Sequence, residues 1–249
     1  MRDTCLRIIN AMLATVLCLP CPAIAAEKIP EWNYFGGAND DEGWDRISPL
    51  CSDGTSQSPV GIDYTTITAM PPLTIRYGDM KTRIERKEHT LVIDTQGRNT
   101  LSVDGHSYRL TQIRIHTPSE HSRQGHTYPI ELHFIHHDSK GRIMIAAVFI
   151  ETGAGNQTLQ QFIDNAPHKK DIVVNLSFDP ASLLPVDKGY FAYTGSLSWP
   201  PCTEGVEWRI FKTPITATKE QLDALEKLIS RNARTLQPLY MRTIRETKD

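Results

Sequence analysis

Short stretches in which apolar and polar residues alternate, or in which apolar residues run together, recur through most of the chain. Successive side chains of a β-strand point to opposite faces, so these stretches predict strands with at least one buried face. They cover residues 73–77, 90–94, 110–116, 130–136, 143–150 and 206–211. Glycine, asparagine and aspartate separate them, as is typical of turns between antiparallel strands. The pattern predicts a mainly β protein, α+β by content, that opens with a loop over residues 32–54.

Two later segments repeat with the period of a helix instead. In the first, apolar residues fall three or four positions apart, at Leu159, Phe162, Ile163 and Ala166. In the second, Thr218 and Gln221 form a capping box, which marks the start of a helix. One apolar face follows it, at Leu222, Leu225, Leu228 and Ile229. We expect both segments to be peripheral helices that cover the sheet.

The first 25 residues have the layout of a secretory signal peptide. Arg2 and Arg7 precede an apolar run from Ile8 to about Leu19, and residues 23–25 form a small-x-small cleavage site. The alternative is an uncleaved membrane anchor, but the run is short for a span and prolines follow it. The expectation is a signal peptide over residues 1–25 and a single domain over residues 26–249. After cleavage no membrane span would remain, and the protein would be periplasmic or secreted.

Composition narrows the function little further. The chain is 39% hydrophobic and 22% charged, values that are ordinary for a globular protein. Its formal net charge of −2 provides no basic field for nucleic acid. Cys51 and Cys202 are the cysteines that remain after signal cleavage. In an oxidising compartment they suggest one disulfide, with two unpaired buried thiols as the alternative.

Six of the nine histidines cluster in the middle of the chain. On the strand that ends at His116, this residue shares a face with Gln112 and Arg114. On the next strand His133 shares a face with Glu131. If the two strands pair, His116 and His133 converge at a distance that suits a zinc ion. Spacing alone leaves open a second reading, in which both are core histidines with hydrogen-bond partners.

Five motifs that follow one another along the chain resemble those of bacterial α-carbonic anhydrases. They are residues 57–60 (QSPV), 112–121 (QIRIHTPSEH), 131–136 (ELHFIH), 193–201 (YTGSLSWPP) and 232–239 (NARTLQPL). Cys51 and Cys202 also stand where bacterial members have a disulfide. The chain is therefore identified as a member of this family from about Trp32 to Arg242. The resemblance implies a single domain with a large twisted, mostly antiparallel sheet and peripheral helices.

The resemblance also implies zinc as the cofactor and the reversible hydration of carbon dioxide to bicarbonate as the reaction. In this chemistry a zinc-bound water, made acidic by the metal, supplies the attacking hydroxide. His116 and His133 match two zinc ligands. The residues that match the groups orienting such ligands are Gln112, Glu131 and Asn232.

Further positions match the rest of the family's active site. Glu120 matches a carboxylate that accepts a hydrogen bond from a pocket hydroxyl, here that of Ser198. His89 resembles the proton shuttle, although an exposed histidine with no role is equally expected. The apolar wall of the substrate pocket matches Ile135, Ile145, Leu197, Trp199 and Trp208. Plain core packing is the alternative for Ile135, Ile145 and Trp208.

The chain departs from the family pattern at two of these positions. Arg114 occupies the first zinc-ligand position, and a guanidinium has no lone pair to donate and repels a cation. His121, His136 and His137 are poorly placed to substitute for it. Trp199 occupies a position that is usually small or medium, so it would narrow the pocket.

The sequence therefore predicts an impaired or inactive carbonic anhydrase homologue. One alternative is an enzyme that retains zinc through His116, His133 and waters. Another is an acatalytic relative in which Arg114 pairs with Glu120 or holds a small anion such as bicarbonate. A third is a protein that binds a protein partner and uses the sheet as a scaffold. The sequence indicates no particular partner, host or oligomeric state.

Overall fold

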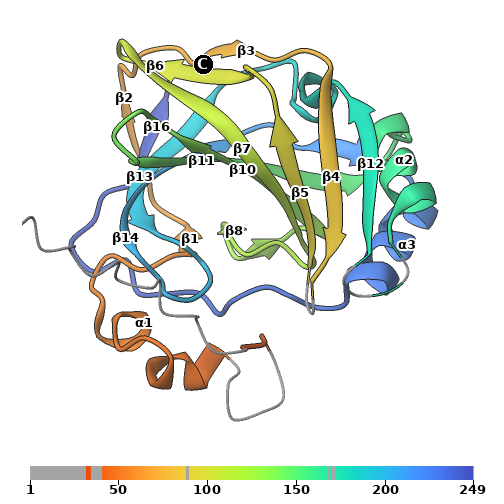
Figure 1. Ribbon diagram of the computed structural model, residues 1–249. Coiled ribbons are helices and arrows are strands. Elements are labelled where there is room, and N and C mark those ends of the chain that lie inside the picture. The colour runs from red at the N-terminus through yellow and green to blue at the C-terminus, as the bar shows by residue number, and fades with distance from the viewer. Residues whose placement is uncertain (1–31, 35–40, 88–89, 168, 170–171, 249) are drawn as a thin grey trace, which may run out of the picture.

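One large, strongly curved sheet forms most of the molecule (Figure 1). The computed structural model describes residues 32–34, 41–87, 90–167, 169 and 172–248. In this part of the chain the sheet has 13 strands, and ten of them follow the order β12-β4-β5-β7-β10-β11-β14-β13-β16-β2. β3 and β6 extend the sheet next to β7, and β15 pairs with β11. Most neighbours are antiparallel, while β11 pairs in parallel with β14 and β15, and β16 with β2.

The strands of this sheet are β2 (Thr66–Thr68), β3 (Thr74–Arg76), β4 (Met80–Arg86), β5 (Leu91–Gln96), β6 (Thr100–Val103), β7 (His106–His116), β10 (Ile130–His137), β11 (Ile143–Thr152), β12 (Val173–Phe178), β13 (Tyr190–Ser196), β14 (Glu204–Phe211), β15 (Ile215–Ala217) and β16 (Arg245–Thr247). A second, small sheet contains β1 (Gly61–Ile62), β8 (Ser122–Arg123) and β9 (His126–Thr127). The helices are α1 (Leu50–Asp53), α2 (Gln157–Asn165) and α3 (Lys219–Ile229), with 3₁₀ turns at Asp41–Arg46 and Pro180–Leu183.

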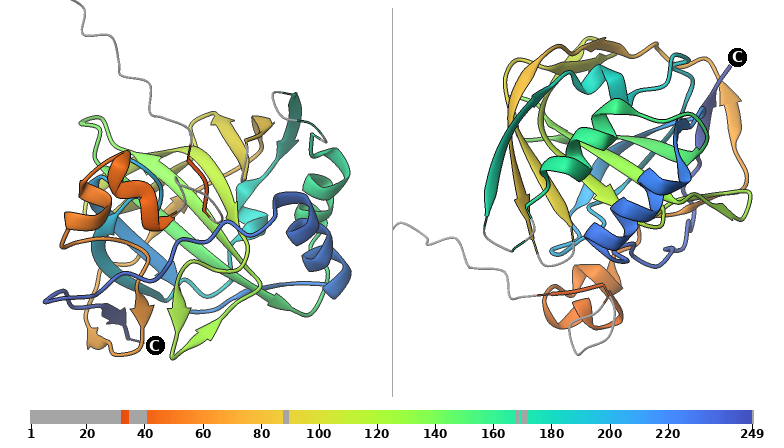
Figure 2. Two further views of the ribbon diagram at one scale, coloured as in Figure 1. Left: turned by 90° about the horizontal axis from the view of Figure 1, so that it is seen from below. Right: turned by 90° about the vertical axis from the view of Figure 1, so that its right-hand side faces the viewer.

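Helices α2 and α3 lie side by side over one face of the sheet (Figure 2). Their apolar faces, including Phe162 and Leu225, pack against residues of the central strands such as Ile113 and Phe134. The capping box predicted at Thr218 is present and starts α3. On the opposite face of the sheet a second buried cluster surrounds Trp208. The central strands are therefore covered on both faces, which explains their nearly continuous apolar runs.

All six predicted strands and both predicted helices are present, so the predicted fold class is confirmed. The sequence analysis missed the other ten strands of the described residues, among them β4, β6, β12 and β13, which have four or more residues each. In β4 and β12 exposed polar residues alternate with less exposed ones, a weak signal for a strand near the edge of the sheet. The segment 32–54 is also not simply a loop, because a 3₁₀ turn and α1 lie within it.

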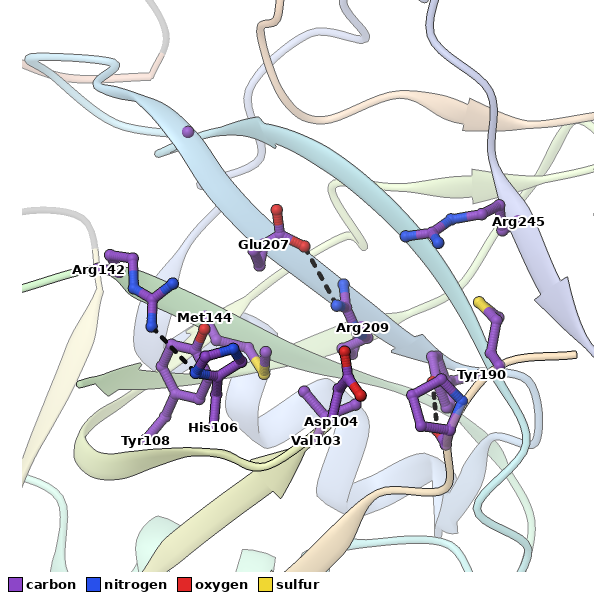
Figure 3. Close-up of a pocket in the computed structure, with 13 residues that line it drawn as sticks. Val103, Asp104, His106, Tyr108, Arg142, Met144, Tyr190, Glu207, Arg209 and Arg245 are labelled. Carbon is purple, nitrogen blue, oxygen red and sulfur yellow. Dashed lines mark hydrogen bonds and ion pairs between the residues drawn. The ribbon is translucent and has the colours of Figure 1, made fainter.

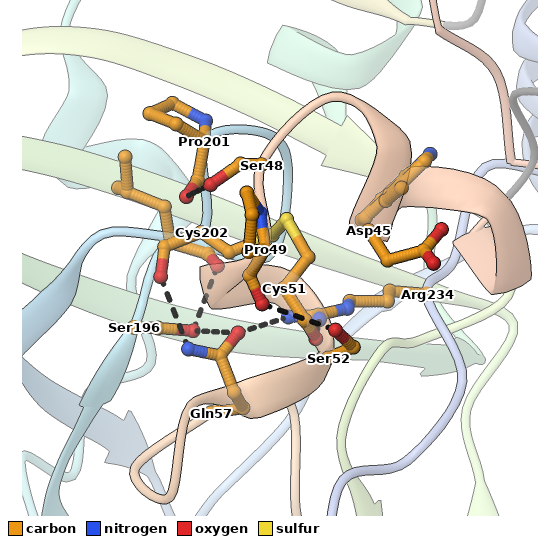
Figure 4. Close-up of a disulfide and its surroundings, with 12 residues drawn as sticks. Asp45, Ser48, Pro49, Cys51, Ser52, Gln57, Ser196, Pro201, Cys202 and Arg234 are labelled. Carbon is orange, nitrogen blue, oxygen red and sulfur yellow. Dashed lines mark hydrogen bonds between the residues drawn. A yellow bond between two sulfur atoms is a disulfide. The ribbon is translucent and has the colours of Figure 1, made fainter.

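The predicted disulfide joins Cys51 of α1 to Cys202, in the loop that links β13 to β14 (Figure 4). Three hydrogen bonds fix the backbone around it. Ser48 Oγ donates to the Pro201 carbonyl at 3.0 Å, Gln57 Nε2 to the Cys202 carbonyl at 3.1 Å, and Arg234 Nη2 to the Cys51 carbonyl at 2.8 Å. The bridge therefore ties the N-terminal segment to the loop that carries Ser198 and Trp199.

Removing this disulfide should destabilise the protein strongly. The cysteines are 151 residues apart, and in the chain-entropy model a loop of this size contributes about 4–5 kcal/mol. Urea unfolding of the double variant Cys51→Ser, Cys202→Ser should show a free energy of unfolding lower by about that amount. If the two free energies of unfolding differ by less than about 1 kcal/mol, the chain-entropy account of this disulfide is wrong.

Candidate metal centre

Pairing of β7 with β10 brings the central histidines together. In this register Arg114 lies opposite His133, and Glu131 lies opposite His116. The rings of His116 and His133 are 4.3 Å apart between centroids, and both side chains are fully buried. Side chains opposite one another on paired strands share a face, so Arg114 belongs to the same group.

Each of these two imidazoles uses one nitrogen for a hydrogen bond and leaves the other without a partner. His116 Nδ1 donates to the Asn232 carbonyl at 2.9 Å, and His133 Nε2 donates to Glu131 Oε1 at 2.9 Å. Burial lowers the pKa of both histidines, so both are neutral. The other nitrogen of each ring, His116 Nε2 or His133 Nδ1, is buried and carries a lone pair that accepts no hydrogen bond. Buried polar atoms are rarely left in this state, and two together suggest a cation between them.

Glu131 is the acceptor that organises this group. Its Oε2 accepts from the amides of Glu120 and His121, both at 2.8 Å, and its Oε1 accepts from His121 Nδ1 at 2.7 Å as well as from His133. Burial alone would raise the pKa of this carboxyl, but the electrostatic interactions with His121 and His133, which include a hydrogen bond from each, outweigh it and lower the pKa. Glu131 is therefore a carboxylate that fixes which nitrogen of His133 carries the proton.

Glu120 is the second buried carboxyl of the site. It accepts hydrogen bonds from the Ser198 hydroxyl and from the amide of Arg234, the latter at 3.0 Å. Burial raises its pKa to about 8, and these two hydrogen bonds only partly oppose the shift. The pairing of Ser198 with Glu120 has the form that the family resemblance implies.

Arg114 is held by a hydrogen bond to Gln112, on its own strand, and by contact with an aromatic ring. Its Nε donates to Gln112 Oε1 at 2.6 Å, and Gln112 Nε2 donates to Asp94 Oδ1 at 2.9 Å. Its Cζ lies 3.7 Å from the centre of the Trp199 ring, a close cation–π contact. The two residues that the sequence analysis predicts to depart from the family pattern thus contact each other. The ion pair with Glu120 considered in the sequence analysis is absent, because the guanidinium is anchored at Gln112 and Trp199 instead.

The residues expected to form the apolar wall gather in one cluster. Its members include Ile135, Ile145, Leu197, Trp199 and Trp208. The Trp208 ring lies 4.9 Å from that of His133, and its Nε1 donates to the Ser196 carbonyl at 3.0 Å. His89, the expected shuttle, lies outside the described residues.

Sequence reasoning missed three supporting residues, His121, Tyr193 and Arg234. His121 Nδ1 donates to Glu131, so its Nε2 accepts from the Tyr193 hydroxyl at 2.7 Å. Arg234 is buried, and its amide reaches Glu120. All three lie inside motifs that the sequence analysis quoted, and this position is the feature by which they could have been recognised as site residues.

A cavity of about 330 Å³ lies elsewhere, at the opposite face of β14 (Figure 3). Glu207 and Arg209 point into it, whereas Trp208 between them points to the metal centre. None of the residues that surround the two unpartnered imidazole nitrogens lines this cavity.

Comparison with known proteins agrees with this arrangement. The family model for eukaryotic-type carbonic anhydrase matches residues 39–248. The carbonic anhydrase of Neisseria gonorrhoeae is 35% identical over 94% of this chain and 96% of its own length. That of Klebsiella pneumoniae is 32% identical over 95% and 98%. The structure of the α-carbonic anhydrase of Photobacterium profundum superposes with a TM-score of 0.83 at 38% identity, covering 87% of this chain and all of that one.

The chain belongs to the α-carbonic anhydrase family. This family is zinc-dependent and acts on carbon dioxide and bicarbonate. A catalytic zinc needs three protein ligands and an open fourth position. His116 Nε2 and His133 Nδ1 fit two of them, since both are unpartnered lone pairs. Arg114, on the same face, offers none. The residues of this carbonic anhydrase homologue therefore do not fit a three-histidine zinc site.

The central role of Glu131 can be tested by stability. Glu131→Gln keeps the shape but replaces one acceptor oxygen by a donor, which then faces donors from the neighbouring groups. We expect the free energy of unfolding to fall by about 3 kcal/mol, measured by urea unfolding. The matched control is Glu207→Gln on the opposite face, which should change it by less than about 1 kcal/mol. Equal effects of the two changes would show that Glu131 does not organise the site.

Proposed function

We propose that this chain is a carbonic anhydrase homologue in which the hydration of carbon dioxide is weak or absent. The observation that carries the proposal is Arg114, which stands on the face of β7 that also presents His116, directly opposite His133. In the matching motif of the family this position holds a zinc-ligating histidine. The alignment of the flanking residues, with Gln112 before it and His116 after it, supports that correspondence.

Arg114 opposes zinc in two ways. A guanidinium stays protonated in proteins and has no lone pair, so a ligand is lost. It also places a positive charge beside the two remaining imidazoles. Burial is the main cause of their lowered pKa, and the Arg114 charge adds to it; the same repulsion acts on a metal ion. Both effects weaken zinc binding, and without zinc the family's hydroxide is not generated.

Trp199 supports the proposal independently. Its ring is buried within the apolar cluster beside Leu197, where the family has a small or medium residue next to the substrate. Because the ring stacks on Arg114, it holds the guanidinium at the site as well as occupying space. The two substitutions therefore act together.

We also propose that the chain is exported and functions in the periplasm or outside the cell. The signal-like residues 1–25 and the Cys51–Cys202 disulfide support this location. Among the described residues no helix is long and apolar enough to cross a membrane.

Mass spectrometry of the exported protein tests the proposed location. We expect a mature chain that begins near Ala26 and carries no free thiol at Cys51 or Cys202. An intact N-terminus on folded, exported material would contradict the cleavage, and free thiols there would contradict the oxidising compartment.

Restoring the missing ligand tests the proposed function. The parent should hold less than one zinc per chain after dialysis and should hydrate carbon dioxide slowly. In Arg114→His the Gln112 amide oxygen can orient the new ring, and a third nitrogen becomes available. Zinc affinity should rise by more than the roughly 10–100-fold that supporting residues usually contribute. Metal analysis and stopped-flow hydration measure both quantities.

Trp199→Thr separates obstruction from ligand loss. Combined with Arg114→His, it should raise kcat/KM above that of Arg114→His alone, since the pocket is widened. Trp199→Thr alone should leave hydration low, because the ligand is still missing. High zinc affinity together with rapid hydration in the parent would contradict the proposed function. If Arg114→His binds no more zinc than the parent, Arg114 does not occupy a zinc-ligand position.

A further inference from the structure

Glu120 lies beside both central histidines and forms with them a group that could hold a metal ion. Glu120 Oε2 is 3.7 Å from His133 Nδ1, and Glu120 Oε1 is 3.5 Å from His116 Nδ1. One potential ligand atom from each of the three residues lies within 4.8 Å of the others. All three side chains are fully buried, and two of them carry the unpartnered nitrogens described above.

We propose that this chain binds a divalent transition metal through His116, His133 and Glu120, as a two-histidine, one-carboxylate site. The proposal rests on the proposed function in one respect, namely that Arg114 is not a ligand. Such a donor set suits zinc, cobalt or ferrous iron, because imidazole and carboxylate both bind these ions.

The distance between Glu120 and His133 agrees with this ligand set. Zinc–nitrogen and zinc–oxygen bonds are about 2.0–2.2 Å, so two ligands in a tetrahedral arrangement lie about 3.4 Å apart. The separation of Glu120 Oε2 from His133 Nδ1 is close to that value. His116 would use Nε2, since its Nδ1 is already bonded to the Asn232 carbonyl.

Because Arg114 is anchored elsewhere, it does not compete with a metal ion for Glu120. Its Nε is bonded to Gln112 and its guanidinium rests on Trp199, and it forms no ion pair with Glu120. A metal ion between the histidines would be repelled by Arg114 but attracted by the Glu131 carboxylate through His133. Glu120, whose pKa burial raises to about 8, would add its negative charge once the ion displaced its proton. Metal binding through Glu120 therefore offsets the charge that Arg114 brings.

This ligand set separates metal binding from hydration. In the family pattern Glu120 is not a ligand but accepts the hydrogen bond of the pocket hydroxyl, here Ser198. Glu120 Oε2 cannot bind the metal and also accept the Ser198 hydrogen bond in its present position. The chain would then contain metal and still be a poor carbonic anhydrase.

The test is metal titration of the chelator-stripped, full mature chain with cobalt and zinc, followed by cobalt absorption and calorimetry. In the parent, Glu120→Gln should weaken cobalt binding at least about 10-fold. In the Arg114→His background three nitrogens suffice, so Glu120→Gln should weaken it less than about 3-fold. The matched control is Glu207→Gln, which should leave affinity unchanged in both backgrounds.

X-ray absorption of the cobalt forms gives a readout that does not depend on the Glu120 variant being stable. We expect two imidazoles in the first shell of the parent and three in Arg114→His. Three imidazoles in the parent, no binding by the parent, or equal effects of Glu120→Gln in the two backgrounds would overturn the proposed ligand set. Rapid hydration by the parent would contradict the proposed function alone, since the titration reports the ligands whatever the rate.

Discussion

The register between β7 and β10 is the constraint on which the rest of the site depends. Because side chains alternate along each strand, a slip of one residue would move every member of the site to the opposite face of the sheet. Two features hold the register. Ile113, Ile115, Leu132 and Phe134 are buried in the core beneath the helices. Beyond Gln112 a bulge at Thr111 shifts the pairing, and its hydroxyl donates to the Ile135 carbonyl at 3.1 Å. The bulge lets Leu110 face the same core as Ile113 while Gln112 faces the metal centre.

Given that register, a few buried hydrogen bonds decide the chemistry. Glu131 orients His133, the Asn232 carbonyl orients His116, and both rings present lone pairs toward the same space. Gln112 is placed to orient a third ring but holds Arg114 instead. Under the proposed function, these residues are the remainder of a zinc site in which Arg114 takes the place of a ligand. Trp199 contacts the guanidinium of Arg114.

Much of this could be predicted from the sequence, because it depends on local periodicity. The alternation at residues 112–116 and 131–135 placed the two histidines on the same face of paired strands, and the capping box at Thr218 marked the start of α3. The contact of Arg114 with Trp199 could not be predicted, since these residues are far apart in sequence and meet only through the tertiary fold. For the same reason the approach of Arg234 to Glu120, and of Glu120 to His133, became evident only in three dimensions.

The central claim is that Arg114, held by Gln112 and Trp199, replaces a nitrogen ligand of the metal. A crystal structure of the mature chain grown in excess zinc, with an anomalous difference map, tests it most directly. The account predicts that the guanidinium stays over Trp199 and that any zinc has two imidazole ligands. A fully occupied zinc with three nitrogen ligands and Arg114 displaced into solvent would contradict it.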